Sequence, residues 1–133
     1  MRSAVLVDSS VFIALLREGL DPGVELLRRC EILDLATCGM VQLEVLRGLA
    51  APRVQARLVQ FMSVMLYVPT DNRMWEEATQ LARDAAREGW TLPAQDLVIA
   101  ACARRIGAAV LTYDKHFLAI PDLQLLRSLE ELE

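Results

Sequence analysis

Two apolar runs of the sequence each lead to an aspartate, and this repeated pattern limits the folds open to the chain. Residues 4–7 (AVLV) run directly into Asp8, and residues 109–111 (AVL) run through Thr-Tyr into Asp114. Short apolar runs of this kind predict strands that are buried on both faces. A charged group at the end of such a strand is costly without a partner, so both aspartates are candidates for a site.

The rest of the chain predicts helices alternating with further short strands. Helix caps, helical apolar periodicity and terminal glycines or prolines define these segments. The predicted helices cover residues 9–17 (capped by Ser9 and Ser10), 22 onward, 40–49, 54–62, 71–88 and 93–105. In the 71–88 helix, Trp75 belongs to the apolar face. The additional predicted strands are 33–37, 65–68 (buried) and 123–126 (at an edge). Such alternation predicts an α/β fold whose parallel sheet is covered by helices on both faces.

Composition leaves two explanations for a strongly apolar chain. The 133 residues are the size of one domain, predicted to span 1–133, with 54% hydrophobic residues and a mean hydropathy of +0.31. Either a partner such as a second copy covers apolar surface, or the α/β sheet is thoroughly buried. The net charge of −4 lacks the basic footprint that usually accompanies binding to nucleic-acid phosphates.

The cysteines and the first apolar run predict a cytoplasmic protein. Cys30, Cys38 and Cys102 form an odd set without metal-binding spacing, so they are interpreted as buried thiols in a reducing compartment. The only histidine, His116, makes a zinc site an unfavourable hypothesis. Asp8 interrupts the first apolar run, so no signal peptide is expected, and no run approaches the length of a membrane span.

Four carboxylates are candidates for a common site. Asp8 and Asp114 converge if their strands are neighbours, because sites of open α/β sheets lie beyond the carboxyl ends of strands. Asp96 lies in the first turn of a helix with a face of small apolar residues, and Glu44 lies among apolar neighbours. Each also has a structural interpretation: helix or turn capping for Asp8 and Asp114, the helix dipole for Asp96, and an ion pair with Arg47 for Glu44.

A bound divalent cation would offset the repulsion among these carboxylates. It would also allow an acidic site to bind a nucleic-acid substrate. Carboxylates crowded together repel one another, and their pKa values rise. Mg²⁺ and Mn²⁺ prefer oxygen ligands from a few carboxylates, water and phosphate. An acidic pocket of this kind binds a phosphodiester through its metal, without a basic surface.

Four segments together resemble the PIN-domain family of metal-dependent ribonucleases, and specifically the VapC-type toxins of type II toxin–antitoxin pairs. They are VLVDSSVFIALL, LEVLRG, LPAQDLVIAACARRIGAAVLTYDKHF and IPDLQLL. The third is the most specific, because it combines an aspartate, a small-residue helix, a glycine and a strand that ends in Thr-x-Asp. The resemblance implies a PIN-like three-layer α/β/α fold with a central parallel sheet of four to five strands.

The resemblance also implies roles for individual residues. The implied metal site holds one or two Mg²⁺ or Mn²⁺ ions, and its acids are Asp8, Glu44, Asp96 and Asp114. Of these, Glu44 binds the metal directly or through water. Ser10 and Thr112 match the family's supporting hydroxyls. Phe117 is interpreted as a core residue, and His116 as structural rather than as a base.

The implied activity is hydrolysis of RNA to 5′-phosphate and 3′-hydroxyl products, which inhibits translation and growth. The implied partners are a small VapB-type antitoxin and a second copy of the chain, which contacts the first through the early helices and residues 54–62. A non-toxin PIN ribonuclease and a non-cleaving PIN binding module remain alternatives. A haloacid-dehalogenase-type phosphatase needs an aspartate where Ser10 stands, and a receiver domain needs adjacent early acids that are absent.

Overall fold

A parallel five-stranded sheet forms the centre of the structure. The computed structural model describes residues 4–133, so the first three residues of the predicted domain lie outside it. The sheet order is β3-β2-β1-β4-β5, and every adjacent pair is parallel. The strands are β1 (Val5–Val7), β2 (Leu35–Cys38), β3 (Leu66–Val68), β4 (Ala109–Leu111) and β5 (Leu125–Leu126). The observed sheet confirms the predicted number and direction of strands.

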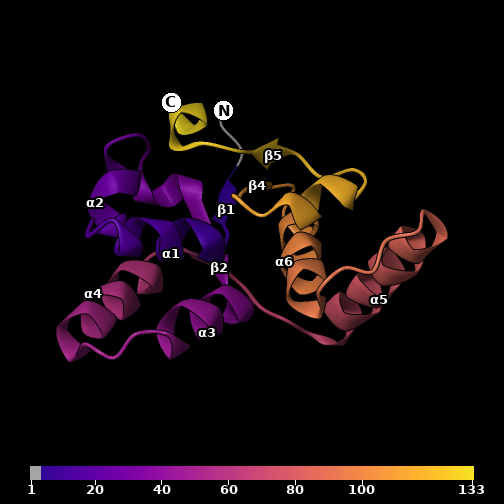
Figure 1. The fold of residues 1–133 in the computed structure, drawn as a ribbon, viewed down its shortest axis with the longest axis horizontal. Helices are drawn as coiled ribbons and strands as arrows, with labels where there is room; N and C mark the ends of the chain where they lie inside the picture. The colour runs from indigo at the N-terminus through magenta and orange to yellow at the C-terminus, as the bar shows by residue number, and fades with distance from the viewer. Residues whose placement is uncertain (1–3) are drawn as a thin grey trace.

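Helices cover both faces of this sheet. Figure 1 shows α1–α4 gathered on one side of the strands and α5 and α6 on the other. The helices are α1 (Ser9–Arg17), α2 (Pro22–Leu27), α3 (Gly39–Arg47), α4 (Pro52–Ser63), α5 (Asn72–Arg87) and α6 (Ala94–Arg105). Three short 3-10 helices complete the described chain: η1 (Ile32–Asp34), η2 (Lys115–Ala119) and η3 (Leu129–Leu132). This arrangement is the predicted three-layer α/β/α fold.

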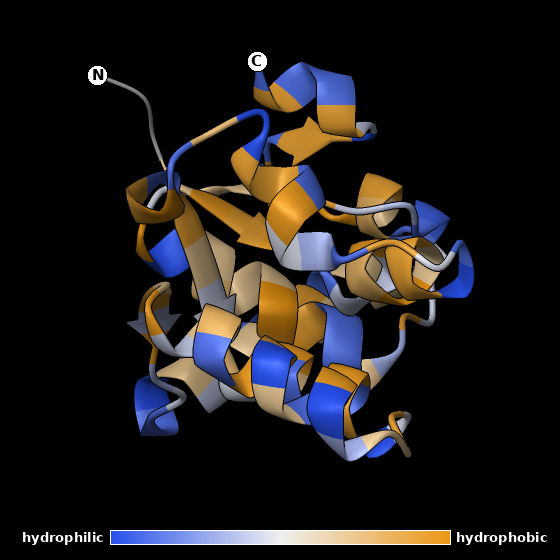
Figure 2. Ribbon diagram, turned by 90° about the vertical axis from the view of Figure 1, so that its left-hand side faces the viewer, coloured by the Kyte–Doolittle hydropathy of each residue, from blue (hydrophilic) through white to orange (hydrophobic). Residues whose placement is uncertain are grey.

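The core is centred on β1 and α6. Figure 2 shows hydrophobic colouring along the central strands and mixed colouring along the surrounding helices. All three residues of β1 are buried, and so is every residue of α6 from Asp96 to Ala103. A helix that is buried around its whole circumference has little freedom to shift. The backbone that carries Asp96 is therefore held firmly.

Two predictions about burial are wrong. The strand predicted as buried at 65–68 is β3, an edge strand in which Leu66 and Tyr67 are each 50% exposed. Trp75 is 51% exposed, because the buried face of α5 is formed by other residues: Met74, Ala78, Leu81 and Ala85. Both errors arise because an apolar residue next to a buried one can face solvent.

The thiols and the helices agree largely with the sequence predictions. Cys38 and Cys102 are buried free thiols, whereas Cys30 is only half-buried. Phe117 is fully buried, as predicted. Across residues 4–133, every helix is too short or too polar to cross a lipid bilayer.

Candidate metal centre

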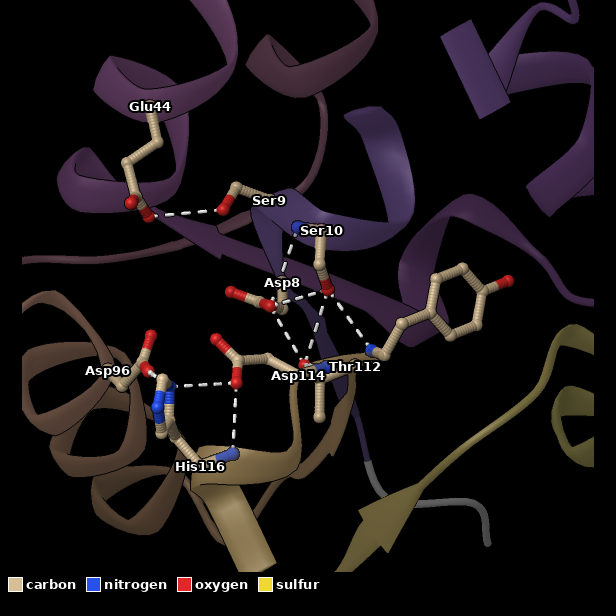
Figure 3. Close-up of polar contacts among 9 residues, drawn as sticks. Asp8, Ser9, Ser10, Glu44, Asp96, Thr112, Asp114 and His116 are labelled. Atoms are coloured by element: carbon tan, nitrogen blue, oxygen red, sulfur yellow. Dashed lines mark hydrogen bonds and ion pairs between the residues drawn. The ribbon is translucent and has the colours of Figure 1, made fainter. Parts of the chain in front are cut away.

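The central pairing of β1 with β4 brings Asp8 and Asp114 to the same edge of the sheet. Val7 is in register with Leu111, and the Asp8 backbone N–H donates to the Leu111 carbonyl at 2.9 Å. Each aspartate follows the carboxyl end of its strand, where sites of open α/β sheets form. The sequence predicted that Asp8 and Asp114 converge if their strands are neighbours. The strands are neighbours, and the two side chains lie at the same edge (Figure 3).

The Asp8 carboxylate is 2% exposed and caps α1. Its Oδ2 accepts hydrogen bonds from the Ser10 hydroxyl at 2.7 Å, the Thr112 hydroxyl at 2.8 Å and the Ser10 backbone N–H at 3.4 Å. Asp8 thus caps this helix, which confirms its structural interpretation, whereas the predicted capping by Ser9 and Ser10 is wrong. Every one of these bonds falls on Oδ2, which leaves Oδ1 available to another ligand.

The two hydroxyls that hold Asp8 also connect β1 to the chain after β4. Thr112 Oγ1 accepts from the Asp114 backbone N–H at 2.9 Å, and Ser10 Oγ accepts from the Tyr113 backbone N–H at 3.1 Å. Each hydroxyl therefore accepts from a backbone amide and donates its proton to the Asp8 carboxylate. This network fixes the orientation of Asp8.

A second group of ligand atoms lies opposite Asp8. His116 Nδ1 is 2.9 Å from Asp114 Oδ1 and 3.3 Å from Asp96 Oδ2. One potential metal-binding atom from each of these three residues lies within 4.8 Å of the other two. Asp114 Oδ1 also accepts from the His116 backbone N–H at 2.9 Å and so caps η2. Asp96 Oδ2, in contrast, is buried and accepts no hydrogen bond from the described residues.

The electrostatics of the site are those of crowded acids. Burial raises the pKa of Asp96 to about 7, and the nearby carboxylates of Asp114 and Asp8 act in the same direction. The interaction with His116 opposes this rise. At neutral pH the Asp96 carboxyl therefore carries a proton part of the time, and a cation placed among these groups would displace that proton.

Glu44 approaches the same region from α3. Its Oε1 accepts a hydrogen bond from the Ser9 hydroxyl at 3.1 Å, and burial is the main cause of its raised pKa. The predicted alternative, an ion pair with Arg47, is absent from residues 4–133. Sequence reasoning did not foresee the contact of Ser9 with Glu44, because these residues lie on different helices and no local pattern pairs them.

The residues present fit a hard divalent cation. Asp96 Oδ2 accepts no hydrogen bond from the described residues, and Oδ1 of Asp8 is open, so both are available as carboxylate oxygen donors. Asp114 adds a third carboxylate. Figure 3 shows Asp8, Asp96 and Asp114 around one space, with Glu44 at its margin. Carboxylate donors of this kind suit Mg²⁺ and Mn²⁺.

The fold has three layers, α/β/α, and acidic side chains gather beyond the ends of its neighbouring parallel strands. These two features define a class of acidic-site α/β domains. The PIN-domain family model matches residues 5–123, which is most of the chain. The chain therefore belongs to the PIN-domain family. None of the curated proteins matches it.

Solved structures with the same fold include several VapBC structures and a FitAcB structure. DNA-bound VapBC from Salmonella typhimurium has a TM-score of 0.78 at 19% identity, with 93% of this chain and 97% of that chain covered. FitAcB from Neisseria gonorrhoeae has a TM-score of 0.74 at 22% identity, with 92% and 96% covered. VapBC-5 from Mycobacterium tuberculosis, described as a member of the VapBC family of toxin–antitoxin systems, has a TM-score of 0.65 at 27% identity, with 95% and 99% covered.

The raised pKa of Asp96 predicts that replacing it with asparagine stabilises the metal-free protein. A carboxyl whose pKa is higher in the folded state contributes most to stability below its unfolded pKa, near 4, and the contribution is lost as the pH rises through about 7. The groups facing it are Asp8, Asp114 and His116. At pH 8, we expect Asp96→Asn to raise the free energy of unfolding by about 2 kcal/mol.

Urea unfolding in the presence of a chelator at pH 8 and pH 4 measures this effect. The gain should largely disappear at pH 4, which lies far below the folded pKa of Asp96 and close to its unfolded pKa, so that little of the energetic difference remains. Glu76→Gln, which removes an exposed carboxylate from α5, is the control and should change stability little at either pH. Equal stability of wild type and Asp96→Asn at pH 8 would contradict the prediction.

Proposed function

We propose that this chain is a Mg²⁺- or Mn²⁺-dependent endoribonuclease and the toxin of a VapBC-type toxin–antitoxin pair. The observation that carries the proposal is the convergence of Asp8, Asp96 and Asp114 from three separate elements onto one space, with Glu44 beside it. Membership of the PIN-domain family supports the same activity. We further propose that residues 1–133 act as a single domain in the cytoplasm.

In this proposal, Asp8, Asp96 and Asp114 hold one or two cations, and Glu44 binds directly or through water. When bound, such an ion supplies the Lewis acidity that activates water and stabilises charge on a phosphodiester. Ser10 and Thr112 keep the Asp8 carboxylate in a fixed orientation through their hydrogen bonds to Oδ2. Fixed ligands of this kind reduce the reorganisation that binding requires.

His116 has a structural role in the proposed mechanism. Its imidazole lies between Asp96 and Asp114, where in the protonated form it partly offsets their repulsion. Its side chain is 51% exposed and contacts both carboxylates, so we assign it to positioning these acids. The neighbouring acids leave the site negative, and RNA phosphates are expected to enter it only in the company of cations.

The proposed partners are a small VapB-type antitoxin, a second copy of this chain and RNA. The similar structures are described as VapBC and FitAcB assemblies, which supports an antitoxin partner. Exposed apolar side chains on the early helices, such as Val24 on α2 and Val59 on α4, provide surface for protein contacts. By hydrolysing RNA to 5′-phosphate and 3′-hydroxyl ends, the free toxin would inhibit translation and growth.

We expect the purified protein, free of antitoxin, to cut total cellular RNA at discrete positions. Sequencing of new 5′-phosphate ends measures this cleavage with Mn²⁺, with Mg²⁺ and with chelator. Chelator and Asp96→Asn should each abolish the new ends, because each removes part of the cation site, whereas Glu76→Gln should cut as the wild type does. Folded wild-type protein that produces no new ends would overturn the nuclease and favour a binding module.

The hydroxyl network predicts a selective effect of Thr112 on metal binding. Thr112→Val removes the donor to Asp8 Oδ2 and should weaken Mn²⁺ binding roughly 10- to 100-fold, as measured by isothermal titration calorimetry. Thr112→Ser keeps the hydroxyl and should retain most of the affinity. Equal Mn²⁺ affinity in Thr112→Val and wild type would show that the network does not position Asp8.

Light scattering tests the proposed homodimer. We expect about twice the 14.8 kDa mass of one chain at micromolar concentration. Val59→Asp places a charge on the exposed apolar side of α4, within the region predicted to make the contact, and should yield monomers. A monomeric wild-type protein at this concentration would reject the dimer.

A further inference from the structure

Trp90 is a large aromatic side chain that is 54% exposed although its backbone is firmly held. The Trp90 N–H donates to the Ala85 carbonyl at 2.9 Å, and the Gly89 N–H donates to the Ala86 carbonyl at 3.0 Å. With Gly89 at φ +85°, these bonds form a Schellman motif that ends α5. The exposed indole therefore extends from a fixed backbone position.

Trp90 lines a surface hollow of about 510 Å³ between the end of α5 and η2. The exposed side chain of Leu118, together with Ile120 and Pro121, supplies further apolar lining, and Arg87 and Glu88 supply charges. A volume of this size accommodates a small ligand or one unit of a larger one.

Two elements of the chain lead from the hollow to the candidate metal centre. Asp114 caps η2 and His116 lies in its first turn, with its imidazole directed at Asp96 and Asp114 (Figure 3). Residues three apart in a 3-10 helix share one side, so Ala119, which lines the hollow, lies roughly 6 Å beyond His116 on that side. On the other side, Trp90 belongs to the short connection that leads into the first turn of α6, where Asp96 lies.

The lining favours a neutral, planar ligand over an anion. Arg87 is paired with Asp84 at 3.1 Å, and Glu88 adds an exposed carboxylate, so the hollow offers no uncompensated positive charge to a phosphate. An exposed indole on a rigid backbone suits stacking of an unpaired base, which is how proteins commonly bind single-stranded RNA.

We propose that this hollow holds a nucleobase of the RNA substrate, stacked on Trp90, close to the phosphodiester that is cut. The proposal rests on the proposed ribonuclease function and adds the position where one unpaired base is bound. Trp90 is thus a residue for binding and selecting the substrate, and it takes no part in holding the metal.

The two tryptophans of the chain provide a matched pair of probes. Trp75 is 51% exposed at the other end of α5 and lies outside the hollow. Their indole N–H signals in nitrogen-15 NMR can be assigned with Trp75→Phe and Trp90→Phe, and Asp96→Asn prevents cleavage during the titration. On addition of short oligoadenylate or oligocytidylate with Mg²⁺, we expect the Trp90 signal to move and the Trp75 signal to stay.

Affinity measurements test the contribution of stacking. Trp90→Ala should weaken oligoadenylate binding about tenfold, whereas Trp90→Phe, which keeps an aromatic face, and Trp75→Ala should retain most of it. Circular dichroism verifies that each variant is folded. Equal binding by Trp90→Ala and Trp75→Ala would overturn the proposal, as would a Trp90 signal that responds to an arginine-rich peptide and not to RNA.

Cleavage kinetics separate this proposal from the proposed function. On an oligoribonucleotide that spans a mapped cleavage site, Trp90→Ala should raise KM more than it lowers kcat, because its effect is on binding. If the wild type cuts this RNA and Trp90→Ala cuts it equally well, the base-binding hollow is rejected and the nuclease stands. If folded wild-type protein cuts no RNA, the nuclease is rejected and the inference with it.

Discussion

The pairing of β1 with β4 is the interaction on which the candidate site depends. A parallel pair places both carboxyl ends at the same edge, so residues 104 positions apart in sequence, Asp8 and Thr112, come within 2.8 Å. The backbone bond from Asp8 to Leu111 and the hydroxyls of Ser10 and Thr112 reinforce this edge. The same contacts that hold the two central strands together therefore also orient a carboxylate of the site.

Placing several acids at this edge of the sheet destabilises the fold, because the carboxylates repel one another. Burial of the apolar core stabilises the fold and offsets this repulsion. Asp96 lies at the start of α6, whose buried residues continue to Ala103, so the helix cannot move its carboxylate away from Asp114 without disturbing the core. The repulsion contributes to the raised pKa of Asp96, whose Oδ2 accepts no hydrogen bond from the described residues. Repulsion of this kind is typical of cation-binding sites, because the bound ion offsets the negative charge of the carboxylates.

The sequence predicted the features that depend on local patterns and missed those that depend on neighbours. Apolar runs and caps located the strands and most helices, and the strand ends predicted where Asp8 and Asp114 meet. The burial of β3 depends on whether a strand is central or at an edge, which its own residues do not specify. The contact between Ser9 and Glu44 depends on how α1 packs against α3, and no spacing along the chain encodes that packing.

The structural and functional interpretations of the acids turn out to be compatible, because a carboxylate has two oxygens. Asp8 caps α1 through Oδ2 alone, so its Oδ1 remains open. Asp114 caps η2 through Oδ1. Asp96 caps nothing, and its Oδ2 lacks a hydrogen bond within residues 4–133. Substituting Asp8 or Asp114 therefore alters a cap and the charge together, whereas substituting Asp96 changes the charge with the caps intact, which makes Asp96 the position where the chemistry of the site can be separated from its architecture.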